Sequence, residues 1–251
     1  MSTAPGTDSP ADRADAPRRA RHHAQPVLTP DDREQVLSVL RAVYDAEKGW
    51  TAEPESQFPA EDLDDSDIAW FMASYDGETV GVMRVLYRLP FELYGKYGFQ
   101  LVDPSIDVEA FLREHDIAEI GRFAVVTKHR GNVRIATALM SLAVADTIDR
   151  GFTHYLTDAF EEDPNSPLGF HRRVLGFEVV ATHDVGELNA QGRRITMLLD
   201  LRAAFMRMRK EQPWIYRQVT RGWDDSRLDR LLDPDAAAPV EQWPHDVARL
   251  P

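Results

Sequence analysis

The chain has 251 residues and a net charge of −13, with 43% hydrophobic residues and no cysteine. This hydrophobic content suffices for a packed core. No apolar run approaches the roughly 20 residues that cross a bilayer, and the polar N-terminus lacks a signal-peptide pattern. The missing cysteine excludes disulfides and thiolate nucleophiles, and the negative charge argues against a general nucleic-acid binder. We therefore expect a globular, cytoplasmic protein that binds neither nucleic acid nor membrane; the oligomeric state stays open.

Residues 1–27 are rich in Ala, Pro, Asp and Arg and almost lack bulky apolar side chains. Such a segment buries too little surface to offset the entropy of ordering, so we expect a disordered tail. The first helix should begin after Thr29, a favourable N-cap that is followed by Pro30 and by Asp32 at the capping-box position.

Two β-rich runs lie on either side of Asp76-Gly77 and predict a hairpin over residues 68–87. The pattern loosens over residues 89–117, where glycines and prolines interrupt four aromatic residues: Phe91, Tyr94, Tyr97 and Phe99. This excursion is either a lid or wall for a substrate, or a loop whose rings close one end of the core.

A strand, a basic turn and a helix follow in residues 118–149. The turn Lys128–Asn132 carries three cationic or titratable side chains and a glycine. Apolar residues then recur at helical spacing, at Ile135, Leu139, Leu142, Ala145 and Ile148. A helix N-terminus beside positive charge presents unpaired backbone N–H groups, so this turn is suited to a phosphate or pyrophosphate.

The rest of the chain alternates short strands and helices. Residues 153–158 predict a strand that would lie parallel to the preceding one if both share a sheet. A short helix over 167–175, a strand from 176 to 181 and a strand over 194–201 complete the pattern. We assign residues 202–251 to a helical extension and an acidic tail.

The order of these elements and two motifs resemble the GNAT acyltransferase superfamily over residues 28–201. Arg130–Ala136 is similar to the family loop that wraps the pyrophosphate of coenzyme A, with one residue inserted. Asn165–Phe177 is similar to the family helix that ends in Leu-Gly-Phe. The resemblance implies an α/β (α+β) fold, a GNAT-like mixed twisted β-sheet flanked by helices.

The strand Glu119–Val125 resembles a strand of acyl-homoserine-lactone synthases and N-acyl amino acid synthases, with Gly121 in place of a serine. This likeness implies an acyl chain longer than acetyl, delivered by coenzyme A or an acyl carrier protein, and an amine acceptor such as an amino acid. The residues expected to bind the acyl carrier are Phe123, Ala124, Val125, Arg130, Gly131, Asn132, Val133, Arg134 and Asn165.

Acyl transfer to an amine requires a base for the amine and an acid for the departing thiolate. Glu119 is the candidate base; strand alternation places it with Gly121 on one face and Arg122 on the other. Its alternative role is a structural ion pair. His171 is the candidate general acid, because it lies near the position of a family tyrosine and an imidazole titrates near neutral pH. Its alternative role is to cap a core helix.

Two further residues are candidates for substrate binding. Arg122 is suited to a substrate carboxylate, or else makes a structural salt bridge. Asp158 belongs to an acidic ledge that would attract a cationic amine, or else to a solvated loop. No set of residues has metal-ligand spacing, so we expect no metal.

The sequence therefore predicts an N-acyltransferase that uses an acyl-CoA or acyl-carrier-protein thioester as donor and the amine of a small molecule as acceptor, by direct attack. Two alternatives stay open. One is acetyl-CoA-dependent acetylation of a small amine, and the other is a non-catalytic sensor of acyl thioesters.

Overall fold

The computed structural model describes residues 22–89 and 95–232. Its strands are β1 (His22–Pro26), β2 (Ile68–Tyr75), β3 (Glu78–Leu86), β4 (Gln100–Leu101), β5 (Ile117–Val125), β6 (His154–Phe160), β7 (Glu178–His183) and β8 (Arg194–Asp200). Its α-helices are α1 (Pro30–Leu40), α3 (Val108–Glu114), α4 (Val133–Asp149), α5 (Leu168–Phe170), α6 (Leu201–Glu211), α7 (Pro213–Val219) and α8 (Asp225–Leu232). Short 3-10 or π-helical turns are η1 (Arg41–Glu47), η2 (Pro54–Gln57), η3 (Ala60–Leu63), η4 (Thr127–His129) and η5 (His171–Leu175).

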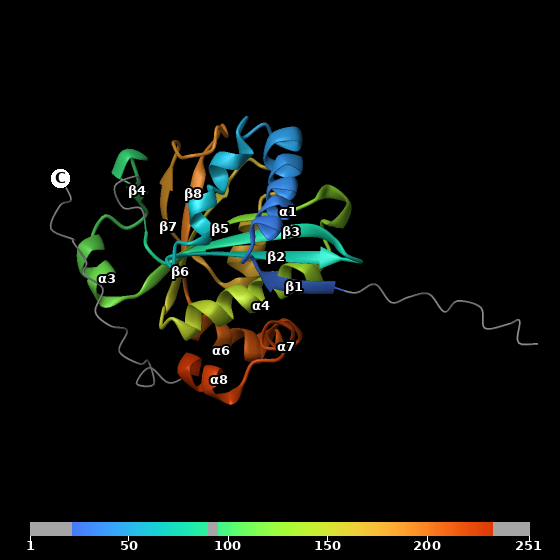
Figure 1. The fold of residues 1–251 in the computed structure, drawn as a ribbon. Coiled ribbons are helices and arrows are strands. Elements are labelled where there is room, and N and C mark those ends of the chain that lie inside the picture. The colour runs from blue at the N-terminus through green and yellow to red at the C-terminus, as the bar shows by residue number, and fades with distance from the viewer. Residues whose placement is uncertain (1–21, 90–94, 233–251) are drawn as a thin grey trace, which may run out of the picture.

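All eight strands form one sheet in the order β1-β2-β3-β5-β6-β8-β7-β4 (Figure 1). Neighbouring strands are antiparallel except β5 and β6, which are parallel and are connected through α4. The predicted mixed sheet and the parallel strand–helix–strand unit are therefore confirmed. Across residues 22–89 and 95–232, no helix is long and apolar enough to span a bilayer.

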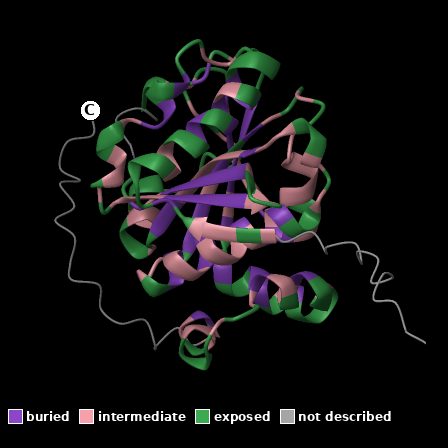
Figure 2. Ribbon diagram, turned by 45° about the vertical axis from the view of Figure 1, so that its right-hand side comes forward, coloured by how far each residue is buried: buried purple, intermediate pink, exposed green. Residues whose placement is uncertain are grey.

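Two apolar clusters cover the two faces of the sheet. One contains side chains of α4 and of the C-terminal helices, and the other contains side chains of α1 and η1. The strands are largely buried between these layers, whereas the outer surfaces of the helices are exposed (Figure 2). Both layers are required because most strands are apolar on both faces.

The N-terminal elements confirm one prediction and correct another. Thr29 caps α1, and Asp32 completes the capping box in both directions. However, residues 22–26, which were assigned to the disordered tail, form strand β1 and pair antiparallel with β2. This strand has little apolar character of its own, so its order comes from hydrogen bonding to an existing sheet edge. Residues 1–21 lie outside the described part.

The predicted hairpin is confirmed as β2 and β3. Asp76 and Gly77 both have positive φ, at 51° and 90°, which is typical of a two-residue hairpin turn. Further along β3, a Cβ on Gly81 would lie 2.9 Å from the Cγ2 atom of Ile135. The missing side chain of this glycine therefore allows α4 to pack closely on the sheet.

The excursion between β3 and β5 contains more regular structure than the sequence predicts. It includes the short strand β4, which pairs with β7 at the sheet edge, and helix α3. Phe91 and Tyr94 lie outside the described residues. Tyr97 and Phe99 stack on His183, with ring centroids 5.7 and 4.4 Å away. These two rings therefore pack against β7.

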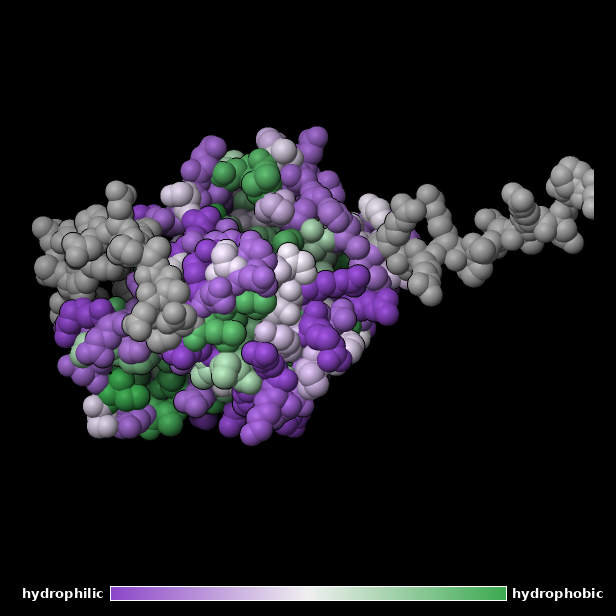
Figure 3. All heavy atoms as spheres, turned by 90° about the horizontal axis from the view of Figure 1, so that it is seen from below, coloured by the Kyte–Doolittle hydropathy of each residue, from purple (hydrophilic) through white to green (hydrophobic). Residues whose placement is uncertain are grey.

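The segment after β8 is helical, as predicted, and packs on α4. Phe205 and Val219 belong to the same apolar cluster as α4, and Asp149 at the end of α4 forms ion pairs with Arg227 and Arg230 of α8. Viewed from the side of these helices, the surface is mainly hydrophilic with separate hydrophobic patches (Figure 3). Residues 233–251 lie outside the described part.

Candidate active site

Strands β5 and β6 separate beyond Glu119. Their parallel pairing covers three residues of each strand and ends at Glu119 opposite Leu156, although both strands continue. Just beyond this point, the Thr157 hydroxyl donates a hydrogen bond to the Ile120 carbonyl at 2.8 Å. A side chain therefore takes the place of a strand partner, and beyond this point the two central strands share no main-chain pairing in the described sheet. We call this region, where the two strands are unpaired, the opening between β5 and β6.

The predicted carrier-binding residues Phe123, Ala124 and Val125 lie on the β5 side of this opening. On the opposite edge, Val125 pairs with Gly81 and Ala124 pairs with Val82 of β3. The edge that faces β6 has no ladder partner in the described sheet at these positions. Such an edge can bind an extended, amide-bearing chain as an added strand.

A β-bulge interrupts β5 at Arg122. Ala124 pairs with Val82 and Gly121 pairs with Arg84, so two residues of β5 oppose one residue of β3. Arg122 has a φ of 49°, in the left-handed region that is uncommon for a residue with a side chain. Bulges redirect side chains, and this one changes the direction of Arg122.

The bulge corrects the predicted faces of β5. Glu119 and Gly121 share a face as expected, because a Cβ on Gly121 would lie 3.1 Å from Glu119 Oε1. Arg122 was predicted on the opposite face, and this was wrong: its guanidinium lies within electrostatic range of both Glu119 and Tyr44. The extra residue reverses the alternation, so the base candidate and the arginine lie together.

Two ion pairs, each with a largely buried arginine, organise this cluster. Arg84 Nη2 lies 3.3 Å from Glu119 Oε1, and Arg122 Nη2 contacts Glu187 Oε2. Burial, together with the nearby charge of Arg122, lowers the pKa of Arg84. Both alternative roles proposed for Glu119 and Arg122 as ion-pair partners are therefore observed, with partners that the sequence reasoning did not identify.

Two residues of this cluster, Arg84 and Glu187, were not among the predicted site residues. A single cation inside the apolar strand Val80–Leu86 was a usable signal, because a buried charge requires a partner. Glu187 gave no such signal, since it lies in a polar loop between β7 and β8.

The second wall of the cluster contains His183 and Asp158. His183 Nε2 lies 3.1 Å from Asp158 Oδ2, and its Nδ1 lies 2.6 Å from the Val185 carbonyl. Asp158 therefore holds a histidine, and it is still exposed enough to interact with a ligand. Burial raises the pKa of nearby Tyr97 to about 12, and the charges of Glu187 and Glu119 add to this effect. The Tyr97 phenol is thus protonated at neutral pH.

The basic turn leads from β5 into α4. Gly131 has a φ of 79°, and Asn132 is the N-cap, whose Oδ1 accepts from the Arg134 amide at 3.2 Å. Val133 and Arg134 are exposed in the first turn. The helix therefore begins where the phosphate site was predicted.

Arg130 is engaged with the protein itself. Its guanidinium donates to both oxygens of Glu47 at 2.5 Å and to the Val125 carbonyl at 3.2 Å. The hydrogen bond from Arg130 holds the pKa of Glu47 below its usual value. Within the described residues, Arg134 forms no ion pair. Of these two arginines, Arg134 is thus the one available to an anion.

The segment after β6 contains the other two predicted residues. Asn165 is exposed, and its backbone N–H donates to Asp163 Oδ1 at 3.0 Å. The His171 ring lies beside two aromatic rings. Its centroid is 6.4 Å from that of Phe170 and 5.0 Å from that of Phe177. Burial lowers the pKa of His171 to about 4, so the imidazole is neutral at pH 7.

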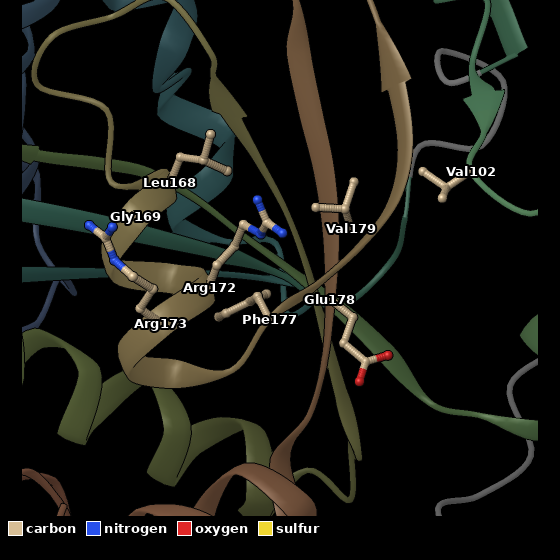
Figure 4. A pocket seen from close by; sticks show the side chains of 8 residues that line it. All are labelled: Val102, Leu168, Gly169, Arg172, Arg173, Phe177, Glu178 and Val179. Atoms are coloured by element: carbon tan, nitrogen blue, oxygen red, sulfur yellow. The ribbon is translucent and has the colours of Figure 1, made fainter.

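An open groove of about 750 Å³ lies beside this segment, between α5 and β7 (Figure 4). Leu168, Phe177 and Val179 form its apolar lining, and Arg172 extends over it from η5. None of the predicted site residues lines this groove. It is therefore separate from the Glu119 and Arg122 cluster. The described residues contain no group of three His, Asp or Glu side chains that suits a metal ion.

A mixed sheet whose parallel central strands separate beside a helix N-terminus and a half-buried carboxylate is consistent with an acyltransferase fold. The sequence matches the acetyltransferase (GNAT) family over residues 34–177, more than half of the chain. The chain belongs to this family and is an acyltransferase. Enzymes of this family use acyl-CoA.

The structure is similar to that of FeeM, an N-acyl amino acid synthase from uncultured soil microbes, with a TM-score of 0.57 and 17% identity over 74% of this chain and 94% of that one. It is also similar to the ribosomal-protein-S18-alanine N-acetyltransferase from Escherichia coli, with a TM-score of 0.50 and 11% identity over 72% and 94%. At these identities the likeness shows the fold alone. No curated protein matches the sequence.

Proposed function

We propose that the protein transfers an acyl group from a coenzyme A or acyl-carrier-protein thioester to the amine of a small molecule that also bears an acidic group, such as an amino acid. One observation carries this proposal. Glu119 and Arg122 lie on the same face of β5, at the point where β5 and β6 separate. A base and a fixed cation at one site suit an acceptor with an amine and an acid.

The donor would bind along the opening between β5 and β6. Its amide-bearing arm would pair with the β5 edge at Phe123–Val125, and its phosphate would bind at the start of α4, near Gly131–Arg134. Both kinds of donor share this arm, so the site accommodates either. Asn165 would lie at the same end of the opening, on the segment after β6.

The reaction is an attack of the acceptor nitrogen on the thioester carbon. Glu119 would take a proton from the amine, directly or through water, as the C–N bond forms. The C–S bond then breaks, and the sulfur leaves as a thiolate that takes up a proton. His171 was predicted to supply this proton. Its lowered pKa argues against that role, because little imidazolium exists at neutral pH.

The residues proposed to bind the acceptor favour a substrate with an acidic group. The bulge changes the direction of the Arg122 side chain, and a planar guanidinium can bind a carboxylate through two parallel hydrogen bonds. Asp158 lies across the cluster and would attract the ammonium group before it loses its proton, as predicted. The similarity of FeeM in fold is consistent with this class of acceptor.

Thiol release tests the proposal. Acetyl-, octanoyl- and palmitoyl-CoA, and octanoyl-carrier protein, would each be assayed with amino acids and with the corresponding decarboxylated amines, such as phenylalanine with phenethylamine. We expect the amino acid of each pair and the longer donors to be preferred. Release with the acetyl donor alone would indicate plain acetylation, and equal rates for both members of each pair would remove the role of Arg122.

A further inference from the structure

Glu187 reaches from the β7–β8 loop to the β5 bulge. Its carboxylate contacts the Arg122 guanidinium, whose side chain is 11% exposed, whereas the Glu187 side chain is 38% exposed. Glu187 therefore lies on the solvent side of the pair and covers Arg122. The group proposed to bind the acceptor's acid is thus already occupied by a carboxylate of the same chain.

The loop that carries Glu187 is anchored by its backbone. The Leu188 carbonyl accepts from Arg194 Nη2 at 2.6 Å, and the Asn189 amide donates to the Trp50 carbonyl at 2.8 Å. Leu188 itself is buried in the apolar cluster on the α1 side of the sheet. These contacts hold the loop without help from Glu187, so its side chain can leave Arg122 while the loop stays in place.

The pair leaves part of the guanidinium unused. The Glu187 contact is made by one nitrogen of Arg122, and the buried Nε of Arg122 has no hydrogen-bond partner. A guanidinium can bind a carboxylate through two nitrogens at once. A ligand carboxylate placed at Arg122 would therefore gain a hydrogen bond that Glu187 does not make.

The second arginine of the cluster explains why an anion is needed there. Arg84 pairs with Glu119, and its Nε is also buried without a partner. If Arg122 lost Glu187 and gained no other anion, its own charge would lose its ion-pair partner, because Glu119 already pairs with Arg84 and the remaining nearby carboxylate, Asp62, acts on Arg84. An uncompensated buried charge is costly, so Glu187 should leave only when another anion replaces it.

We propose that Glu187 is an internal substitute for the acidic group of the acceptor and sets the specificity for acidic acceptors. In the free enzyme it neutralises Arg122, and the acceptor's carboxylate displaces it into solvent. An amine without an acidic group cannot compensate Arg122 and leaves the pair closed. This inference rests on the proposed function, since it assumes that the acceptor reaches Arg122.

Direct binding tests this inference without a donor. The full chain, Glu187→Gln and Glu187→Ala would be titrated calorimetrically at neutral pH with phenylacetate and with its uncharged analogue phenylacetamide. Asp184→Asn is the matched control, because it removes the same charge from an exposed position of the same loop. Circular dichroism would confirm that each variant is folded.

We expect both Glu187 variants to bind phenylacetate about tenfold more tightly than the unchanged protein, since no internal anion competes. Phenylacetamide affinity should stay the same, as should phenylacetate affinity in Asp184→Asn. If Glu187 had a purely structural role, its replacement would change the affinities for phenylacetate and phenylacetamide alike. Equal phenylacetate affinity with and without Glu187, no binding to either variant, or the same gain in Asp184→Asn would overturn the proposal.

Steady-state kinetics distinguishes the proposed acyl-transfer function from the proposed role of Glu187. In Glu187→Gln, the KM for an amino acid should fall relative to that for its decarboxylated amine, with kcat little changed. If the unchanged protein releases no thiol with any donor and amine, the proposed function fails. The calorimetric comparison still decides whether Glu187 competes with a ligand carboxylate.

Discussion

His171 is predicted to make the stability of the protein depend on pH. Replacement by phenylalanine keeps an aromatic ring between Phe170 and Phe177 and removes the titratable group. It also removes a buried Nδ1 that has no hydrogen-bond partner. At neutral pH we therefore expect this variant to be about as stable as the unchanged protein, because the ring packing is kept and no hydrogen bond is lost.

The magnitude follows from the two pKa values. Burial lowers the pKa of His171 from 6.5 to about 4 in the folded state. The unfolded chain then binds the proton more strongly, so the contribution of His171 to stability is present above pH 6.5 and is lost as the pH falls towards 4. Between about pH 7 and about pH 4.5, this loss amounts to about 2 kcal/mol.

Urea unfolding of both proteins at these two pH values measures the effect. The free energy of unfolding should fall by about 2 kcal/mol more in the unchanged protein than in His171→Phe. The pKa of His154 is also lowered by burial, but its contribution is common to both proteins and cancels in the comparison. Parallel losses in the two proteins would refute the assigned burial of a neutral His171 and would restore it as a candidate proton donor.

Three further predictions concern the site and the core. Glu119→Gln should lower kcat for thiol release at least about a hundredfold with little change in donor KM. The control is Glu178→Gln, at an exposed position of β7. A smaller loss would leave Glu119 as an ion-pair residue. Arg134→Ala should raise the dissociation constant of coenzyme A about fivefold in calorimetry. Arg130→Ala should mainly lower the melting temperature. A larger loss of coenzyme A affinity in Arg130→Ala than in Arg134→Ala would show that Arg130 leaves its carboxylate partner to bind phosphate. Gly81→Ala should lower the free energy of unfolding in urea by about 1–3 kcal/mol, because its Cβ would lie 2.9 Å from a side chain of α4; an unchanged value would mean that α4 shifts at no cost.

The sequence alone determined the elements that depend on local chemistry. The Thr29 capping box fixed the start of α1, and Asp76-Gly77 fixed the turn of the β2–β3 hairpin. Helical spacing of apolar residues predicted α4, and its N-terminus beside the basic turn was predicted with it. These signals act over a few residues, so no knowledge of distant partners was required. They also carried the resemblance to the acyltransferase family, which the family match confirmed.

Tertiary structure alone decided which charges meet. The bulge that turns Arg122 towards Glu119 depends on the register between β3 and β5. Its partner Glu187 lies 65 residues away in the sequence, and Arg130 is held by a carboxylate 83 residues away. The order of residues 22–26 likewise depends on a sheet edge formed by β2. Contacts of this kind join segments that only the folded sheet brings together, and they leave no periodic signal in either segment.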